Sequence, residues 1–326
     1  ESSMHKQDEN ITEHLLDFSL DIAGTSRADT VLVYAEVFQD EAAVEDYLND
    51  AEASDCRVVL VARDHSRSLR ELGASVIRVP DIKLTRVGQI KVAILLGLAR
   101  GMFREGEMLV CLTGMAESHT LDGILFMEIG EEFELFAGCD AGDISEDTHP
   151  EVLERVLDVA VSLGTEGREG KPVGTIFVLG DPQDILAHSQ QMVMNPFRGY
   201  EREQRNIMDA NVQETIKEFS PIDGAFIMDR DGTVETAGAY LQTEDQAVEL
   251  PRGLGARHRS AAAITAFTDS VSITVSETTG NITIFREGRV IMEIEKPRPI
   301  GPTTASRQQF FEATREGIDV EPENGE

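Results

Sequence analysis

The sequence lacks tryptophan and has only three cysteines and six lysines among its 326 residues. Cys56, Cys111 and Cys139 form no C-x-x-C pair, and no two of the seven histidines are spaced as H-x-x-x-H. Neither a disulfide framework nor a preformed zinc site is therefore predicted, and the cysteines are expected to be mostly buried thiols in a reducing compartment. The longest apolar run, residues 92–99, is far shorter than the ~20 residues that a membrane-spanning helix needs. We therefore expect a cytoplasmic protein with no membrane partner.

Positive charge is also scarce. The chain has 60 acidic and 29 basic residues, which gives a net charge of −31. A nucleic acid or an anionic membrane would be repelled by such a surface, so neither is expected as a partner. An acid excess with few lysines indicates a halophile, because molar salt in the cytoplasm shortens the Debye length to about 3 Å and screens the self-repulsion. An ordinary acidic cytosolic protein is the alternative.

A chain of this length exceeds the usual size of one compact core, so two domains are expected. In residues 1–147, apolar strand-like runs alternate with helical patterns, which is typical of a doubly wound α/β domain with a mainly parallel sheet. The expected strands are residues 31–37, 57–61, 75–79, 108–112 and 123–129, and the expected helices are residues 11–22, 41–52, 67–72 and 86–103. Turn formers and acids in residues 138–148 indicate the end of this domain.

Residues 148–296 are expected to form an α+β domain with a mixed central sheet, because strands follow one another with few helices between them. The Asp231-Gly232 pair predicts a hairpin of residues 224–228 and 233–240. The other expected elements are helices at 150–163, 200–219 and 256–267 and strands at 173–179, 271–275, 282–285 and 290–294. Residues 297–326, with four prolines and an acidic end, are expected to be a mobile tail.

The densest positive charge lies just before and within the predicted helix at 256–267. Arg252, Arg257 and Arg259, with His258, stand close together, and glycines at 253 and 255 precede the helix. Glycine lets a ligand approach the backbone, and the helix start presents free N–H groups to an anion. Phosphate binding is therefore one interpretation. Pairing of these arginines with surface acids is the other, and the spacing alone favours neither.

Two further positions carry candidate carboxylates. Asp223 stands before a predicted strand and is followed by the small residues Gly224 and Ala225, so it could bind a divalent cation or orient a hydroxyl nucleophile. Ser276 and Glu277 end another predicted strand and could meet a sugar or a metal. Ordinary turn chemistry is the alternative at both positions, and composition alone favours it at Asp223.

Taken together, these motifs resemble a known family. Residues 223–225, 257–259 and 276–277 resemble, in order and spacing, the DGA, RHR and following serine-glutamate motifs of diadenylate cyclases. The similarity covers about residues 150–294. The N-terminal α/β half resembles the archaeal branch of this family, whose N-terminal part is similar to the C-terminal domain of pyruvate kinase. That second resemblance rests on layout and few residues, and it implies a regulatory domain, for which the strand end at 113–119 is a candidate ligand site.

The resemblance implies condensation of two ATP molecules into cyclic di-AMP and two pyrophosphates, with Mg²⁺ or Mn²⁺ as cofactor. It implies that Asp223 and Glu277 bind metal and that Asp223 also activates the ribose hydroxyl. The implied catalytic residues are Asp223, Arg257, His258 and Arg259, and the implied nucleotide-binding residues are Gly224, Ala225, Leu254, Gly255, Ala256, Arg257, His258, Arg259, Ser276 and Glu277. Ala256 stands where some members have threonine, so a hydroxyl contact to phosphate is lost there.

The symmetric product implies a homo-oligomer, at least a two-fold dimer in which two ATP sites face each other. The alternative is a non-catalytic sensor that binds ATP or cyclic di-AMP in the same pocket. A DNA-scanning protein is not expected, because no basic DNA-binding module is visible.

Overall fold

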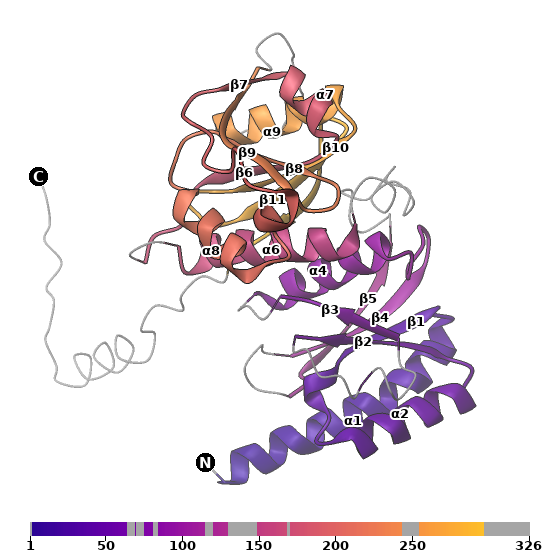
Figure 1. Cartoon of the computed structure of the whole chain (residues 1–326). Coiled ribbons are helices and arrows are strands. Elements are labelled where there is room, and N and C mark those ends of the chain that lie inside the picture. The colour runs from indigo at the N-terminus through magenta and orange to yellow at the C-terminus, as the bar shows by residue number, and fades with distance from the viewer. Residues whose placement is uncertain are drawn as a thin grey trace, which may run out of the picture. The chain divides into compact units, whose positions relative to one another are not determined.

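The computed structural model describes residues 2–63, 69, 75–80, 84–114, 120–129, 149–167, 170–242 and 254–296, the first nine of these as backbone only (Figure 1). The described residues up to Lys296 belong to one compact unit. Several predictions fall outside the described residues. These are the helix expected at 67–72 (apart from position 69), the domain boundary at 138–148, the tail at 297–326, Cys139, Arg252 and most of the candidate ligand site at 113–119. None of the helices within the described ranges is long and apolar enough to cross a membrane.

The N-terminal half contains a five-stranded sheet with the order β3-β2-β1-β4-β5. Its strands are β1 (Thr30–Tyr34), β2 (Arg57–Ala62), β3 (Ser75–Arg78), β4 (Met108–Thr113) and β5 (Gly123–Glu128). The pairs β1–β2, β2–β3 and β1–β4 are parallel, whereas β4–β5 is antiparallel. The predicted mixture of helices and strands is confirmed, with one antiparallel strand at the edge of the sheet.

Helices pack on both faces of this sheet. They are α1 (Ser2–Ser26), α2 (Glu41–Ala53) and α4 (Arg86–Ala99), with a 3-10 turn, η1 (Ala35–Val37), where the strand was expected to continue. Val31 and Val33 of β1 pack with residues of α1 and α2, and Leu32 packs with residues of α4 on the opposite face. The alternation follows from the two-residue period of a strand.

The limits of α2 and α4 are set by local chemistry. The side chain of Asp40 accepts a hydrogen bond from the backbone N–H of Ala43, and that of Thr85 accepts one from Gly88, so both helices begin at a capping residue. The sequence predicted that α4 would reach residue 103. The helix ends at Ala99 instead, because Gly101 adopts φ 65° and the chain turns there.

The second half contains a seven-stranded sheet with the order β12-β11-β10-β6-β8-β9-β7. Its strands are β6 (Thr175–Gly180), β7 (Ser189–Gln191), β8 (Ala225–Asp229), β9 (Val234–Leu241), β10 (Ser270–Val275), β11 (Ile282–Arg286) and β12 (Arg289–Ile294). The pair β6–β8 is parallel and all the other pairs are antiparallel. The expected hairpin is β8–β9, and its turn lies at the expected Asp-Gly pair.

The helices of this half are α6 (Pro150–Thr165), α7 (Pro182–Ala187), α8 (Ala210–Phe219) and α9 (Ala256–Phe267). The continuous helix predicted for residues 200–219 is wrong. Residues Arg202–Arg205 form a 3-10 turn, η2, Asn206 bridges to Thr233, and α8 begins only after Asp209, whose side chain accepts from the N–H of Asn211. The short elements α7 and β7 were not predicted.

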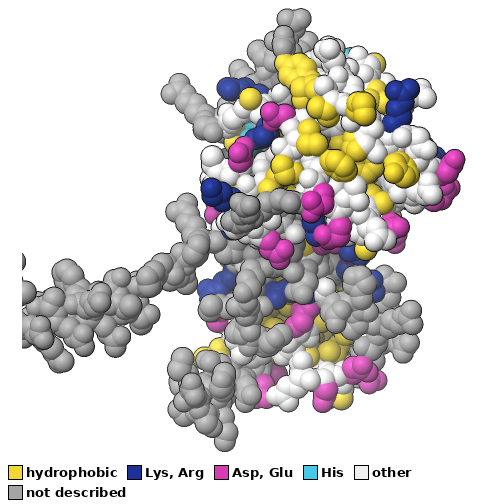
Figure 2. Space-filling model, turned by 60° about the vertical axis from the view of Figure 1, so that its left-hand side comes forward, with side chains coloured by type: hydrophobic (Ala, Val, Ile, Leu, Met, Phe, Trp, Pro, Cys, Tyr) yellow, Lys and Arg dark blue, Asp and Glu magenta, His cyan; other side chains and the backbone are white. Residues whose placement is uncertain are grey.

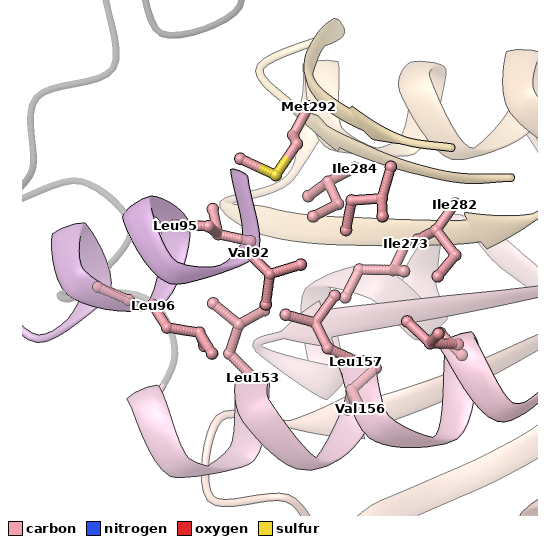
Figure 3. Packing of buried hydrophobic residues seen from close by; sticks show 14 of the residues in the cluster. Val92, Leu95, Leu96, Leu153, Val156, Leu157, Ile273, Ile282, Ile284 and Met292 are labelled. Atoms are coloured by element: carbon pink, nitrogen blue, oxygen red, sulfur yellow. The ribbon is translucent and has the colours of Figure 1, made fainter. Parts of the chain in front are cut away.

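α4 also packs against the second half. Its apolar side chains share one core with α6 and with strands β10 to β12, so this core crosses the expected boundary at residue 147. Figure 3 shows the contact from close by. The labelled residues are Val92, Leu95 and Leu96 of α4, Leu153, Val156 and Leu157 of α6, and Ile273, Ile282, Ile284 and Met292 of the strands. An ion pair of 2.5 Å between Arg100 Nη2 and Glu154 Oε2 adds a polar contact.

Candidate active site

The topology of the second sheet gathers the predicted motifs at one edge. β6 and β8 are parallel and begin at this edge, with Ile176 beside Ala225. β10 is antiparallel to β6 and ends there, with Val275 beside Thr175. The residues just before β8 and just after β10 therefore lie close together. α9 precedes β10 and runs in the opposite direction, so its first turn returns to the same edge.

Arg257 joins the two candidate carboxylates. Its Nη1 lies 2.8 Å from Oε2 of Glu277, and its Nη2 lies 3.2 Å from Oδ1 of Asp223. The carboxylate side chains are 64% and 85% exposed, respectively. Ion pairs so open to water contribute little to folding stability. This arrangement therefore leaves a guanidinium and two carboxylates available to a ligand.

The backbone at Asp223 is fixed by a close approach of two glycines. Gly224 has φ 111°, and a Cβ placed there would lie 2.6 Å from the carbonyl carbon of Gly238. Gly238 has φ 71° and belongs to β9. Because both conformations and this distance exclude a larger residue, glycine at position 224 is a structural requirement. It holds Asp223 at the mouth of β8.

Among the residues that the structure describes, none covers the N-terminus of α9. Gly255 is its N-cap residue and gives no side-chain cap, and a Cβ built at this position meets nothing within 4 Å. Gly255 and Ala256 are exposed, and Leu254 is half-buried. The first N–H groups of a helix lack partners within the helix and carry the positive end of its dipole. This end of α9 is suited to an anion that also contacts Arg257.

The three residues of the RHR motif point to different surroundings. Arg257 contacts the carboxylates, whereas the His258 ring packs edge-on against Phe285 of β11, with ring centroids 6.1 Å apart. Burial lowers the pKa of His258, Glu293 opposes this shift, and Arg257 adds to it. Arg259 is exposed and makes no ion pair or side-chain hydrogen bond to the residues that the structure describes.

Ser276 lies in the turn that follows β10. Its Oγ is 3.3 Å from the N–H of Thr279 and 3.2 Å from the hydroxyl of Thr278. Its own N–H donates to the carbonyl oxygen of Asn281 at 2.8 Å. Ser276 thus stabilises the turn that presents Glu277 to Arg257.

Comparisons with known proteins match both halves of the chain to family models. Residues 162–290 match the nucleotide-binding domain described as DisA bacterial checkpoint controller (DAC), and residues 12–136 match a probable sensor domain, DacZ_P. A diadenylate cyclase of Methanocaldococcus jannaschii is 28% identical over 87% of this chain and 97% of its own length. One of Haloferax volcanii is 38% identical over 45% of this chain and 53% of its own length.

Residues 162–290 therefore form a DAC domain, and the chain is similar to diadenylate cyclases over most of its length. The DAC domain contains all the motif residues described above. Among solved structures, a double mutant of DacA from Staphylococcus aureus is 20% identical over 51% of this chain and 94% of its own, with a TM-score of 0.30. A hypothetical membrane spanning protein from Bacillus cereus is 17% identical over 48% and 68%, with a TM-score of 0.36.

Gly174 is a residue of the DAC site to which sequence analysis gave no role. It lies just before β6, and a Cβ placed there would be 2.7 Å from Nη1 of Arg257 and 2.8 Å from Cβ of Glu277. Because Gly174 has no side chain, the guanidinium of Arg257 can occupy this space. The only indication in the sequence was a glycine at the second position of the strand predicted at residues 173–179.

The residues present fit a divalent cation that is shared with a substrate. No group of three metal-binding side chains occurs within the described ranges. Asp223 and Glu277 nevertheless bring two carboxylates to one guanidinium, and Mg²⁺ is commonly bound by one or two carboxylates together with substrate phosphates. These hard oxygen donors suit Mg²⁺ or Mn²⁺.

Proposed function

We propose that this chain condenses two ATP molecules into cyclic di-AMP with release of two pyrophosphates. The observation that carries the proposal is the convergence of Asp223, Arg257 and Glu277 beside the open N-terminus of α9, within the region that matches the DAC family model. The similarity to diadenylate cyclases favours an enzyme over the alternative of a non-catalytic sensor.

The chemistry is a nucleotidyl transfer in which the ribose 3′-oxygen of each ATP bonds to the α-phosphorus of the other. The bond from that phosphorus to the bridging oxygen breaks, and pyrophosphate leaves in line. We assign Asp223 to orient the 3′-hydroxyl and accept its proton. Such reactions depend on positioning and on neutralisation of charge rather than on a covalent intermediate.

Arg257 and the first N–H groups of α9 would bind the α-phosphate, where charge develops. Arg257 now bridges two carboxylates, and a phosphate would replace one or both of these contacts. Arg259, which is exposed, would reach the outer phosphates, and His258 would hold the first turn of α9 against the sheet. The remaining nucleotide-binding residues in this proposal are Gly224, Ala225, Leu254, Gly255, Ala256, Ser276 and Glu277.

A divalent cation held by Asp223 and Glu277 would neutralise phosphate charge and favour ionisation of the attacking hydroxyl. Mn²⁺ and Mg²⁺ both suit this donor set, and the choice between them is open to experiment.

The product is symmetric, so two sites must face each other in a two-fold assembly of at least two chains. Apolar side chains beside Asp223 support this proposal. Ile222 precedes Asp223 and is 36% exposed, and Val193, which lies against Gly238, is 42% exposed. Met194 is 93% exposed. Figure 2 shows hydrophobic side chains (yellow) gathered on one face of this half of the molecule. A second copy of the chain would cover such a surface.

We further propose that residues 1–147 form a regulatory domain, residues 148–296 the cyclase domain and residues 297–326 a tail. The match of residues 12–136 to a probable sensor domain supports a regulatory role. The parallel strands β1 to β4, with helices on both faces, are consistent with a doubly wound domain similar to the C-terminal domain of pyruvate kinase. A cytoplasmic location is part of the same proposal.

The proposal is tested by incubating the full chain with ATP and Mn²⁺ in molar KCl and identifying the product by mass spectrometry. We expect cyclic di-AMP and pyrophosphate. Replacement of the carboxylate by an amide in Asp223→Asn removes the base and the metal ligand, so the rate should fall by at least about 100-fold, the usual range for loss of general-base catalysis.

Asp184→Asn is the matched control, because Asp184 is an exposed carboxylate on α7, which follows the opposite end of β6. This variant should keep wild-type activity. Wild-type turnover by Asp223→Asn would remove Asp223 from its assigned role, and the absence of cyclic di-AMP from the wild-type reaction would refute the proposed function.

A further inference from the structure

α4 is linked to the cyclase domain by a polar contact as well as by the apolar core of Figure 3. Lys91, in the second turn of α4, donates from Nζ to the backbone carbonyl oxygen of Glu293 at 2.9 Å. Glu293 lies on β12, the edge strand of the second sheet. The ammonium group therefore holds the backbone of that strand at a defined residue, which apolar packing alone would not specify.

The side chain of Glu293 continues from β12 towards the Ser-Glu motif. Its Oε1 accepts a hydrogen bond from Nδ2 of Asn281 at 3.1 Å. The backbone carbonyl oxygen of Asn281 accepts a hydrogen bond from the backbone N–H of Ser276 at 2.8 Å. Its side-chain oxygen also accepts the N–H of Lys296 at 3.2 Å, so the orientation of Asn281 is fixed on both sides. The turn that presents Glu277 to Arg257 thus depends on Glu293.

The charge of the same carboxylate also acts on the RHR motif. Burial is the largest influence on His258 and lowers the pKa of its imidazole, Glu293 on β12 raises it, and Arg257 on the same helix lowers it. Phe285, the aromatic neighbour of this ring on β11, carries no charge. Glu293 is therefore the negative charge that favours the imidazolium form of His258.

We propose that Glu293 is a positioning residue through which α4 of the N-terminal domain sets the geometry of the Ser-Glu turn and acts on the RHR motif of the cyclase site. A displacement of α4 would move the Glu293 backbone through Lys91, and with it both Asn281 and the carboxylate charge that acts on His258. The domain that matches a probable sensor would in this way act on the site without contacting ATP. The activity readouts of this inference rest on the proposed function, whereas the titration of His258 does not.

Two substitutions separate the roles of the Glu293 side chain. Glu293→Gln keeps an oxygen that can accept from Asn281 but removes the charge, so the pKa of His258, followed by NMR in the full chain, should fall while kcat/KM near neutral pH changes by less than about threefold. Glu293→Ala removes both the oxygen and the charge, so the same fall in the pKa of His258 should be accompanied by a loss in kcat/KM of about tenfold, mainly in kcat, as expected for one lost, partly buried hydrogen bond.

A double-mutant cycle tests the link to α4. Lys91→Met keeps the apolar stem and removes the donor, and it should lower kcat/KM by about three- to tenfold. If Lys91 acts through Glu293, the double variant Lys91→Met/Glu293→Ala should be no less active than Glu293→Ala alone. The control is Arg86→Met, which removes a charge from the same helix but contacts Asp122 of the N-terminal half, and it should leave activity unchanged.

If the fold-loss in kcat/KM of the double variant equals the product of the two single losses, Lys91 and Glu293 act independently. That result would overturn the proposed link from Lys91 through Glu293 to the site. An unchanged pKa of His258 in both Glu293 variants would overturn the role of the carboxylate. If the wild type makes no cyclic di-AMP, the proposed function fails, and the His258 titration still decides whether Glu293 acts on the motif.

Discussion

At the scale of single residues, the site depends on a missing side chain as much as on charged ones. Gly174 leaves the space beside Arg257, so Gly174→Ala must displace the guanidinium or the Cβ of Glu277, which would lie only 2.7 and 2.8 Å away. We expect kcat/KM to fall by about tenfold or more, since small displacements of catalytic groups are costly. A measurement of the melting temperature should show a much smaller effect, because the side chains that would move, Arg257 and Glu277, are 35% and 64% exposed.

Gly24→Ala is the control for this substitution. Gly24 lies in α1, and a Cβ there meets nothing within 4 Å, so alanine should preserve activity and slightly stabilise the helix. Full activity of Gly174→Ala would show that the contact between Gly174 and Arg257 is unimportant.

The sequence predicted which residues form the motifs but not how they divide their contacts. Successive residues of a helix point about 100° apart, so Arg257, His258 and Arg259 cannot all face one ligand. The structure directs Arg257 to the carboxylates and His258 to Phe285. Gly174 and Glu293 were missed because their effects depend on residues about 80 and 35 positions away in the chain, as the tertiary contacts place them.

At the scale of elements, α6 contains a carboxylate whose environment disfavours its charge. Asp158 is 23% exposed and accepts from Nη1 of Arg155 at 2.6 Å. Burial raises its pKa from 3.8 to about 6, and the nearby Arg155 only partly opposes this. The folded protein therefore holds this proton to a higher pH than the unfolded chain does, and the free energy of unfolding falls as the pH rises from about 4 to 6.

Asp158→Asn should therefore stabilise the protein above pH 6 and have little effect near pH 4. The limit set by the pKa difference is about 3 kcal/mol, at 1.36 kcal/mol per unit. Urea denaturation midpoints of the variant and the wild type, measured from pH 4 to 7.5, provide the test. If Asp158→Asn were more stable than the wild type by the same amount at every pH, or less stable at pH 7.5, the raised pKa of Asp158 would not explain its effect.

Elements with strong local patterns were predicted well and the others were not. The β8–β9 hairpin was predicted because Asp231-Gly232 suits a tight turn, and α9 because its apolar and small residues follow glycines at positions 253 and 255. The helix expected at 200–219 failed because Asp209 caps a later start and Asn206 bonds across to Thr233. The three-residue strand β7 carries no periodicity and is defined only by its pairing with β9.

At the scale of the whole molecule, the sequence predicted two cores but not the place where they join. α4 was expected to belong to the first sheet alone. Apolar residues surround most of this helix. The structure explains the pattern, because one face of α4 packs on the first sheet and another face packs on α6 and on β10 to β12. A helix buried on two sides is the physical link that makes regulation of one half by the other possible.

The net charge of −31 leads to a prediction for the entire chain. Salt weakens attraction in ion pairs and repulsion among like charges alike, but 60 acidic residues against 29 basic ones make repulsion the larger effect. Because the Debye length shortens from about 10 Å at 0.1 M to about 3 Å at 1 M, the melting temperature should rise steeply up to about 1 M KCl.

Screening should then saturate, whereas stabilisation by exclusion of salt from the surface would continue to grow with concentration. Melting curves from 0.1 to about 3 M KCl separate the two effects, with sucrose as a control that does not screen charge. The expected result is a melting temperature that rises and levels off near 1 M KCl, whereas any rise in sucrose should continue with concentration. Equal melting temperatures in dilute buffer and in molar KCl would mean that the acidic surface is not an adaptation to salt.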